Sequence, residues 1–143
     1  MKIEAGETIT KGLFRLATEV PDDCQSKGLY SRMDFTVVWQ SSDGTPHPFG
    51  RFSLEPMPGC CGIVVSTGSY IEPVQRSQHN YSRWFHELKA KVAKHFGYST
   101  MIMTTQLRNF PEVIGASRSG WRFQHSFRNK RTDNDIGIAI KDL

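Results

Sequence analysis

A polar segment that precedes a strongly amphipathic stretch holds the residues best suited to chemistry. It consists of Arg76, Ser77, Gln78, His79, Asn80, Tyr81 and Ser82. Backbone amides at a helix start favour a bound phosphate, and hydroxyl and guanidinium side chains can complete such a site. The alternative is an ordinary polar turn in which Asn80 or Ser82 caps the helix. The residue types leave both interpretations open.

Upstream of this segment, one carboxylate and one hydroxyl are candidates for acid–base chemistry. Glu72 follows a predicted strand and could deprotonate an incoming ammonium through a water molecule. A solvated carboxylate beside Arg76 is the alternative, and it is the interpretation that we favour from the residues alone. Ser69 on the same strand could position that water, although unassisted strand serines are usually structural.

The other residues that could do chemistry indicate neither a metal site nor a nucleophile. The five histidines show no metal-ligand spacing, and no metal is predicted. His86, inside the amphipathic stretch, is expected at the surface. The three cysteines include no CxxC pair, which argues against a disulfide framework and a zinc site. Cys60 and Cys61 are expected to be buried packing residues.

The elements that must position these residues follow from hydrophobic periodicity and turn signals. The patterns predict strands at 2–5, 34–40, 49–55, 62–70, 98–105, 121–127 and 136–140. They predict helices from Thr8 or Thr10 to Val20, over 82–96 and from Asn109 to Gly120. Asp43-Gly44 predicts a hairpin. Gly62 and Gly68 predict a bulge or a splay in the strand expected at 62–70.

The stretch 82–96 gives the strongest local pattern. One apolar stripe is expected to face the core and is formed by Trp84, Phe85, Leu88, Val92 and Phe96. The basic residues Arg83, Lys89, Lys91 and Lys94 are expected to face water. Glu87 and Lys91 are spaced as a helical ion pair, and Gly97 stands where a helix-ending glycine belongs.

Composition describes a single domain, 1–143, with 38% hydrophobic and 22% charged residues and a net charge of +4. The sequence has no apolar run of membrane-spanning length and no signal-peptide pattern, so a cytoplasmic, non-membrane protein is expected. Five basic residues and no acid lie between 118 and 131. An exposed hairpin is the favoured explanation, and nucleic-acid binding is considered unlikely.

The predicted order β-α-β-β-β-α-β-α-β-β resembles that of the GNAT superfamily of acetyl-CoA-dependent N-acetyltransferases. Pro73, Arg76 and Phe85 match positions around that family's R-G-x-G-x-G/A cofactor loop, and Asn109 and Gly120-Trp121 match its next helix. The resemblance implies an α/β (α+β) fold with a mixed, mostly antiparallel sheet of about six to seven strands flanked by helices.

The resemblance also implies a function. An acetyl group would pass from acetyl-CoA to an amine by direct attack, with Glu72 and Ser69 as the catalytic candidates. Coenzyme A would be held by Tyr70, Ile71, the segment 76–82 and Asn109. An oxyanion donor is expected among the strand amides between Tyr70 and Glu72. The partners implied are an acyl-CoA and an amine or protein acceptor, and a homodimer is left open.

Two departures from the family pattern support an alternative function. Ser77, His79 and Tyr81 stand where the family has glycines, which let amides approach phosphate closely. Ala116 stands where many members carry a tyrosine that protonates the leaving thiolate. The alternative is a GNAT-fold binding protein that has lost catalysis and acts on a host or partner protein. Degenerate members of this kind are also encoded by bacteriophages, which would place the chain in the host cytoplasm or the virion.

Overall fold

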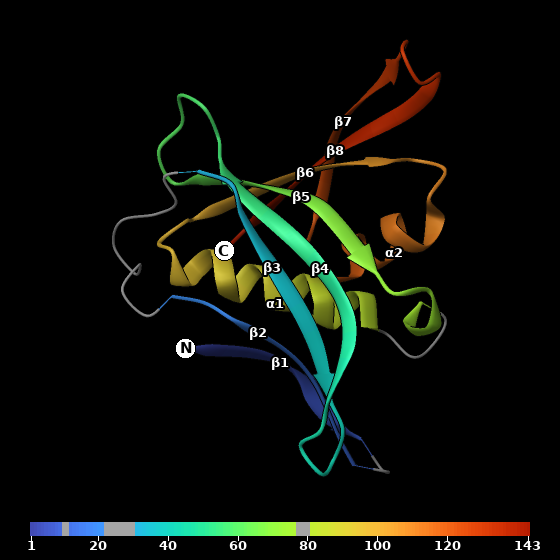
Figure 1. The fold of residues 1–143 in the computed structure, drawn as a ribbon. Helices are drawn as coiled ribbons and strands as arrows, with labels where there is room; N and C mark the ends of the chain where they lie inside the picture. The colour runs from blue at the N-terminus through green and yellow to red at the C-terminus, as the bar shows by residue number, and fades with distance from the viewer. Residues whose placement is uncertain (10–11, 22–30, 77–80) are drawn as a thin grey trace.

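The computed structural model describes residues 1–9, 12–21, 31–76 and 81–143, which form one eight-stranded sheet with two α-helices (Figure 1). The strands are β1 (Lys2–Ile9), β2 (Gly12–Glu19), β3 (Met33–Gln40), β4 (Pro46–Pro56), β5 (Ile63–Ile71), β6 (Thr100–Gln106), β7 (Arg122–Asn129) and β8 (Asn134–Asp142). The helices are α1 (Tyr81–His95), α2 (Phe110–Arg118) and the short 3-10 turn η1 (Pro73–Gln75). This confirms the predicted fold class, with one strand more than expected.

The sheet has the order β1-β2-β3-β4-β5-β6-β8-β7. Every neighbouring pair is antiparallel except β5 and β6, which are parallel and joined through α1. No helix in the described part of the chain is long and apolar enough to cross a membrane.

The helix predicted from Thr8 or Thr10 to Val20 is wrong. Thr8 and Ile9 belong to β1, residues 10–11 lie outside the described residues, and Gly12–Glu19 forms strand β2. It pairs with β1 along its whole length and with β3 through Arg15, Leu16 and Ala17. Leu16 and Val20 are buried, and the Thr18 hydroxyl donates to the Thr36 carbonyl. The apolar spacing also fitted a helix, but pairing with β1 on one side and β3 on the other favours an extended chain.

Helix α1 packs its apolar stripe against the sheet, as predicted. Trp84, Phe85, Leu88, Val92 and Phe96 are all buried. The Phe85 ring meets the rings of Phe49 and Phe52 from β4 edge-on, at centroid distances of 5.7 and 5.9 Å. Gly97 ends the helix region with a φ of +85°, and Glu87 pairs with Lys91 at 3.3 Å.

The pairing of β4 with β5 contains the irregularity predicted from Gly68. Arg51 faces Tyr70 and Ser53 faces Thr67, so β5 carries one extra residue between these pairs. Gly68 adopts a φ of +59° at this bulge. At Gly50 the two backbones approach so closely that a Cβ atom would lie 2.1 Å from the Tyr70 carbonyl oxygen. The close approach of β4 and β5 beside the bulge therefore requires a glycine at position 50.

Strands β7 and β8 form the predicted terminal hairpin, which extends away from the rest of the sheet in Figure 1. Acidic residues of β8 and of the turn neutralise two of its arginines. Arg122 pairs with Asp142 at 2.9 Å, and Arg128 pairs with Asp133 at 2.6 Å and with Asp135 at 3.3 Å. From Arg122 onward the basic run forms the exposed hairpin that the sequence favoured, whereas Arg118 ends α2.

The expectation that Cys60 and Cys61 are buried is wrong. Both are free, exposed thiols in the turn between β4 and β5. The Pro-Gly sequence that precedes them places them in a chain reversal outside the sheet.

Candidate functional site

The candidate site lies where β5 and β6 separate. The two strands pair only through Ile63–Val65 and Thr100–Ile102. Figure 1 shows them running apart toward their carboxyl ends, with α2 beside the opening. The segment of β5 beyond this pairing carries the bulge and the predicted residues Ser69, Tyr70 and Ile71. Crevices at the carboxyl ends of diverging strands are common ligand positions in folds with parallel strands.

Tyr70 and Arg76 lie together at the exit of β5. The Arg76 guanidinium stands over the Tyr70 ring at 5.2 Å from its centroid, and Arg51 of β4 stands over the same ring at 4.8 Å. Arg76 also donates from Nε to the Ile71 carbonyl at 2.8 Å, which fixes the side chain near the strand end. Two guanidinium groups on one ring make this corner positively charged and suited to an anion.

Glu72 joins β5 to η1 and is partly buried. Its backbone amide donates to the Phe49 carbonyl at 2.8 Å, so this amide is engaged within the sheet. Amides alternate in direction along a strand, so the Tyr70 amide also points to β4, where Tyr70 is paired with Arg51. Ile71 is therefore the remaining amide candidate for an oxyanion among the three that the sequence indicated. Ile71 also packs its side chain against the core.

Four of the predicted cofactor-loop residues, Ser77, Gln78, His79 and Asn80, lie outside the described residues. Tyr81 begins α1 directly after them. Ser82 follows in the first turn, and its buried hydroxyl has no hydrogen-bond partner among the described residues. Gly115 of α2 allows the close contact here, because a Cβ at that position would lie 2.2 Å from the Ser82 Oγ atom.

Asn109 stands at the N-cap position of α2, but its exposed side chain makes no capping hydrogen bond. Pro111 and Glu112 occupy the first turn as the sequence predicted. Ala116, one turn after Glu112, is fully buried and brings no hydroxyl to this face of α2.

Lys89 was expected to face water, and the structure contradicts this. Only 1% of the residue is exposed. Its Nζ atom donates to Ser69 Oγ at 2.5 Å and lies 4.4 Å from the centroid of the Phe85 ring. Burial lowers the pKa of this ammonium to about 8, although the Glu112 charge opposes the effect. The predicted residue Ser69 is therefore held by a buried lysine.

His86, expected at the surface, is also buried. Its Nε2 atom lies 3.0 Å from Glu112 Oε1, in an orientation poorly aligned for a hydrogen bond, and its ring meets Trp121 edge-on at 5.8 Å. Burial lowers the pKa of the imidazole more than the Glu112 carboxylate raises it, so the ring is neutral near pH 7. The Nδ1 atom has no partner within the described part of the chain.

The site thus combines predicted and unpredicted residues. Ser69, Tyr70, Ile71, Glu72 and Arg76 lie along one continuous stretch of chain, as the sequence required. Sequence reasoning missed Lys89, His86 and Glu112. A signal for Lys89 was present, because positions 85, 89, 92 and 96 share helical spacing and therefore one face of α1.

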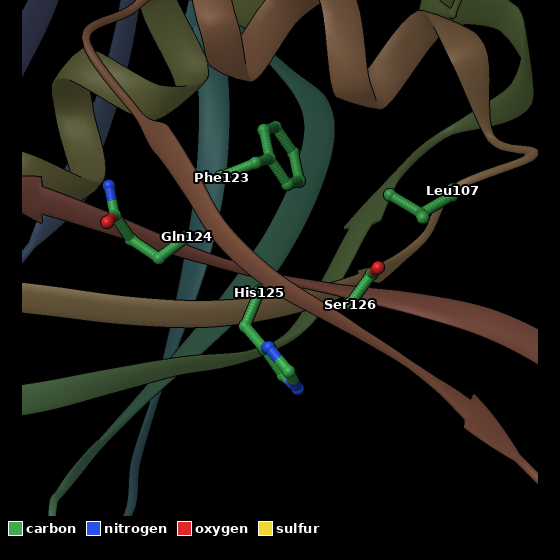
Figure 2. A pocket seen from close by; sticks show the side chains of 5 residues that line it. All are labelled: Leu107, Phe123, Gln124, His125 and Ser126. Carbon is green, nitrogen blue, oxygen red and sulfur yellow. The ribbon is translucent and has the colours of Figure 1, made fainter.

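A hollow lies between β7 and the residue that follows β6, and its lining includes none of the predicted site residues. It has a volume of about 520 Å³ and is lined by Leu107, Phe123, Gln124, His125 and Ser126. Figure 2 shows Phe123 and His125 directed to opposite sides of β7. Gly137 of β8 leaves room for Leu107 and Phe123, since a Cβ there would lie 2.6 and 2.9 Å from their carbons.

No protein-family model matches this sequence, and no curated protein is significantly similar to it in sequence. Solved structures resemble it in fold. An IAA acetyltransferase from Bacillus cereus has a TM-score of 0.61 at 12% identity, over 77% of this chain and 78% of that one. An acetyltransferase from Bacillus subtilis in complex with CoA has a TM-score of 0.60 at 14% identity, over 77% of each chain.

A further similar structure is the spermidine N-acetyltransferase from Vibrio cholerae in complex with CoA and spermine. Its TM-score is 0.63 at 12% identity. The match covers 79% of this chain but 66% of that one, just under two thirds of its length. These similarities confirm the fold that the sequence resemblance implied.

Proposed function

We propose that this chain, which has the GNAT fold, binds coenzyme A and transfers an acetyl group from acetyl-CoA to an amine. The observation that carries the proposal is the separation of β5 from β6 after three paired positions, beside a β5 bulge and an arginine-bearing turn. Structures of this fold that contain CoA support the same conclusion.

The polar groups at the site fit a ligand of this kind. Arg76 and Arg51 present positive charge where the diphosphate would be held, together with the helix start at Tyr81 and Ser82. Buried hydroxyls of Ser66, Thr67 and Ser82 have no partner among the described residues. They can bond to the amide groups of a pantetheine arm. Asn109 would add a further polar contact from α2. Acetyl-CoA supplies the activated acyl group.

The residues of the chain would perform positioning and proton transfer. Glu72 would take a proton from the acceptor ammonium through a water molecule, because only a neutral amine is nucleophilic. The Ile71 amide would stabilise the developing oxyanion. Ser69 would help to position the reacting groups together with Lys89, which donates a hydrogen bond to the Ser69 hydroxyl. The acceptor is an amine of a small molecule or of a protein.

Calorimetric titration with coenzyme A tests the proposal. We expect R76A to weaken binding about tenfold to a hundredfold, because a phosphate loses one charge-assisted hydrogen bond. R118A is the matched control, since Arg118 is an exposed arginine at the far end of α2. Equal affinities for R76A and R118A would contradict the assignment of Arg76. No binding to the parent chain would contradict the function.

A second candidate function is favoured by Ala116, which leaves no proton-donating side chain at that position of α2. In this alternative, the chain is a GNAT-fold binding protein without turnover that acts on a partner protein. Release of free thiol from acetyl-CoA, measured with a panel of polyamines and peptides, separates the two. Coenzyme A binding without any thiol release would favour the binding protein.

A further inference from the structure

Lys89 is a buried cation whose hydrogen-bonding capacity is mostly unused. An ammonium has three N–H donors. Within the described chain one of them reaches Ser69 Oγ, and no carboxylate forms an ion pair with Nζ. A buried charge with so few partners destabilises a fold, whereas an anion bound beside it would offset that cost.

Two of the three N–H donors of Lys89 have no hydrogen-bond partner among the described residues, and a bound anion could accept from them. Phe85 of the same helix covers the ammonium with its ring, and Ser69 of β5 bonds to it. Glu112 of α2 acts on it electrostatically from beyond ion-pair distance, and the buried, neutral His86 of α1 lies 3.0 Å from the Glu112 carboxylate. The Ser69 contact places Nζ beside the bulged part of β5, close in sequence to the Ile71 amide that the proposed function assigns to the oxyanion.

We propose that the Lys89 ammonium binds the sulfur of coenzyme A as a thiolate and so stabilises the leaving group of the transfer. This inference rests on the proposed function. Stabilisation of the leaving thiolate would then come from Lys89 on α1, because Ala116 on α2 has no side chain that could provide it. Lys89 would be a catalytic residue in contact with the reacting sulfur, and Ser69 a positioning residue that holds Nζ toward it.

The step is balanced without a further reactant. The acceptor nitrogen forms a bond to the acyl carbon, and the carbon–sulfur bond breaks with its electron pair remaining on sulfur. Glu72 first takes one proton from the acceptor ammonium through a water molecule, and the neutral amine that results is the nucleophile. After the nitrogen–carbon bond has formed, the nitrogen releases a second proton to solvent. Lys89 stays protonated throughout, and its charge is matched by that of the sulfur.

The test measures thiolate formation rather than turnover. Coenzyme A bound to the parent chain is titrated from pH 6 to pH 10 and followed by the ultraviolet absorbance of the thiolate. An opposite charge in contact lowers the pKa of an acid by about 1–3, so we expect the bound thiol to ionise at lower pH than free coenzyme A. K89M, which removes the charge and keeps an unbranched side chain one heavy atom shorter, should abolish this difference. K94M, at an exposed position of the same helix, should preserve it.

A second measurement needs no variant. The affinity of the parent chain for coenzyme A is compared with that for desulfo-coenzyme A, which lacks the sulfur. We expect the ratio to rise at least tenfold between pH 6 and pH 9. A constant ratio, or the same bound-thiol pKa in the parent and K89M, would overturn this inference and leave the proposed function intact. Failure of both ligands to bind would overturn both.

Discussion

Ser69 on β5 accepts a hydrogen bond of 2.5 Å from the Lys89 ammonium on α1, and this contact joins the bulged strand to the helix beneath it. A residue expected to be solvated is instead a buried charge beside the candidate site. Stability experiments on Lys89 can therefore separate the energetic cost of the charge from its function.

Substitution of Lys89 by methionine should stabilise the protein at pH 7. Burial lowers the pKa of Lys89 from 10.5 to about 8 in the folded state. Below pH 8 both states carry the proton, and the folded state bears the full cost of the charge. That cost corresponds to about 3 kcal/mol as an order of magnitude. Urea denaturation of K89M and the parent at pH 7 measures the gain.

The sign of the pH dependence gives an independent check. Between pH 8 and 10.5 the folded parent releases a proton that the unfolded chain still holds, so the parent gains stability as the pH rises. The advantage of K89M should shrink over this interval. An advantage that is the same at pH 7 and pH 10.5 would mean that the ammonium is not desolvated.

Acidification should destabilise the protein through His86. Burial lowers the pKa of this imidazole below 6.5, so the unfolded chain binds a proton that the folded chain resists. The stability from this group is complete above pH 6.5 and is lost as the pH falls below it. Thermal unfolding between pH 7 and pH 5 should show a smaller decline in H86F than in the parent. A decline of equal size would place the source in other groups.

Truncation of the apolar face of α1 should cost about 2–5 kcal/mol, the usual range for a large buried side chain. L88A tests this, because Leu88 is fully buried in the core. K94A is the matched control on the exposed face and should change stability by less than about 0.5 kcal/mol. Equal denaturation midpoints for L88A and K94A would contradict the packing.

An alanine at position 50 should disturb the β4–β5 bulge. Its Cβ would lie 2.1 Å from a backbone oxygen, which cannot move without shifting Tyr70. We expect a loss of about 1–3 kcal/mol from overpacking. We also expect weaker coenzyme A binding, because Tyr70 supports both arginines. If G50A has the same affinity and stability as the parent, then β4 and β5 can move apart enough at this position to admit a Cβ atom.

Some elements could be predicted from local patterns because a single local cause determines them. The stripe of α1, the Asp43-Gly44 turn and the glycine at position 68 are examples. Strand β2 could not, since its apolar spacing fits a helix and a strand alike. The choice between them is made by pairing with β1 and β3, residues distant in sequence.

The site was predictable only where it is continuous in sequence. Glu72 and Arg76 follow β5, and the sequence predicted that both lie in the turn between this strand and the next helix. The environment of Lys89 depends on Ser69 and Glu112, which reach it from different elements. A lysine is normally solvated, and tertiary packing overrides that tendency here. Burial of a charge is a property of the assembled fold and has no signature in the helix alone.

The short parallel junction between β5 and β6 also bears on how the molecule opens. Three paired positions connect the meander β1–β5 to the unit β6–β8, whereas β6 and β8 pair over seven. We therefore expect the backbone ladder to open as two cooperative units joined by the short β5–β6 pairing. Native-state amide hydrogen exchange should resolve them as two groups of protons with distinct opening free energies. A ligand seated between β5 and β6 would bridge the two units and slow the exchange of both groups together.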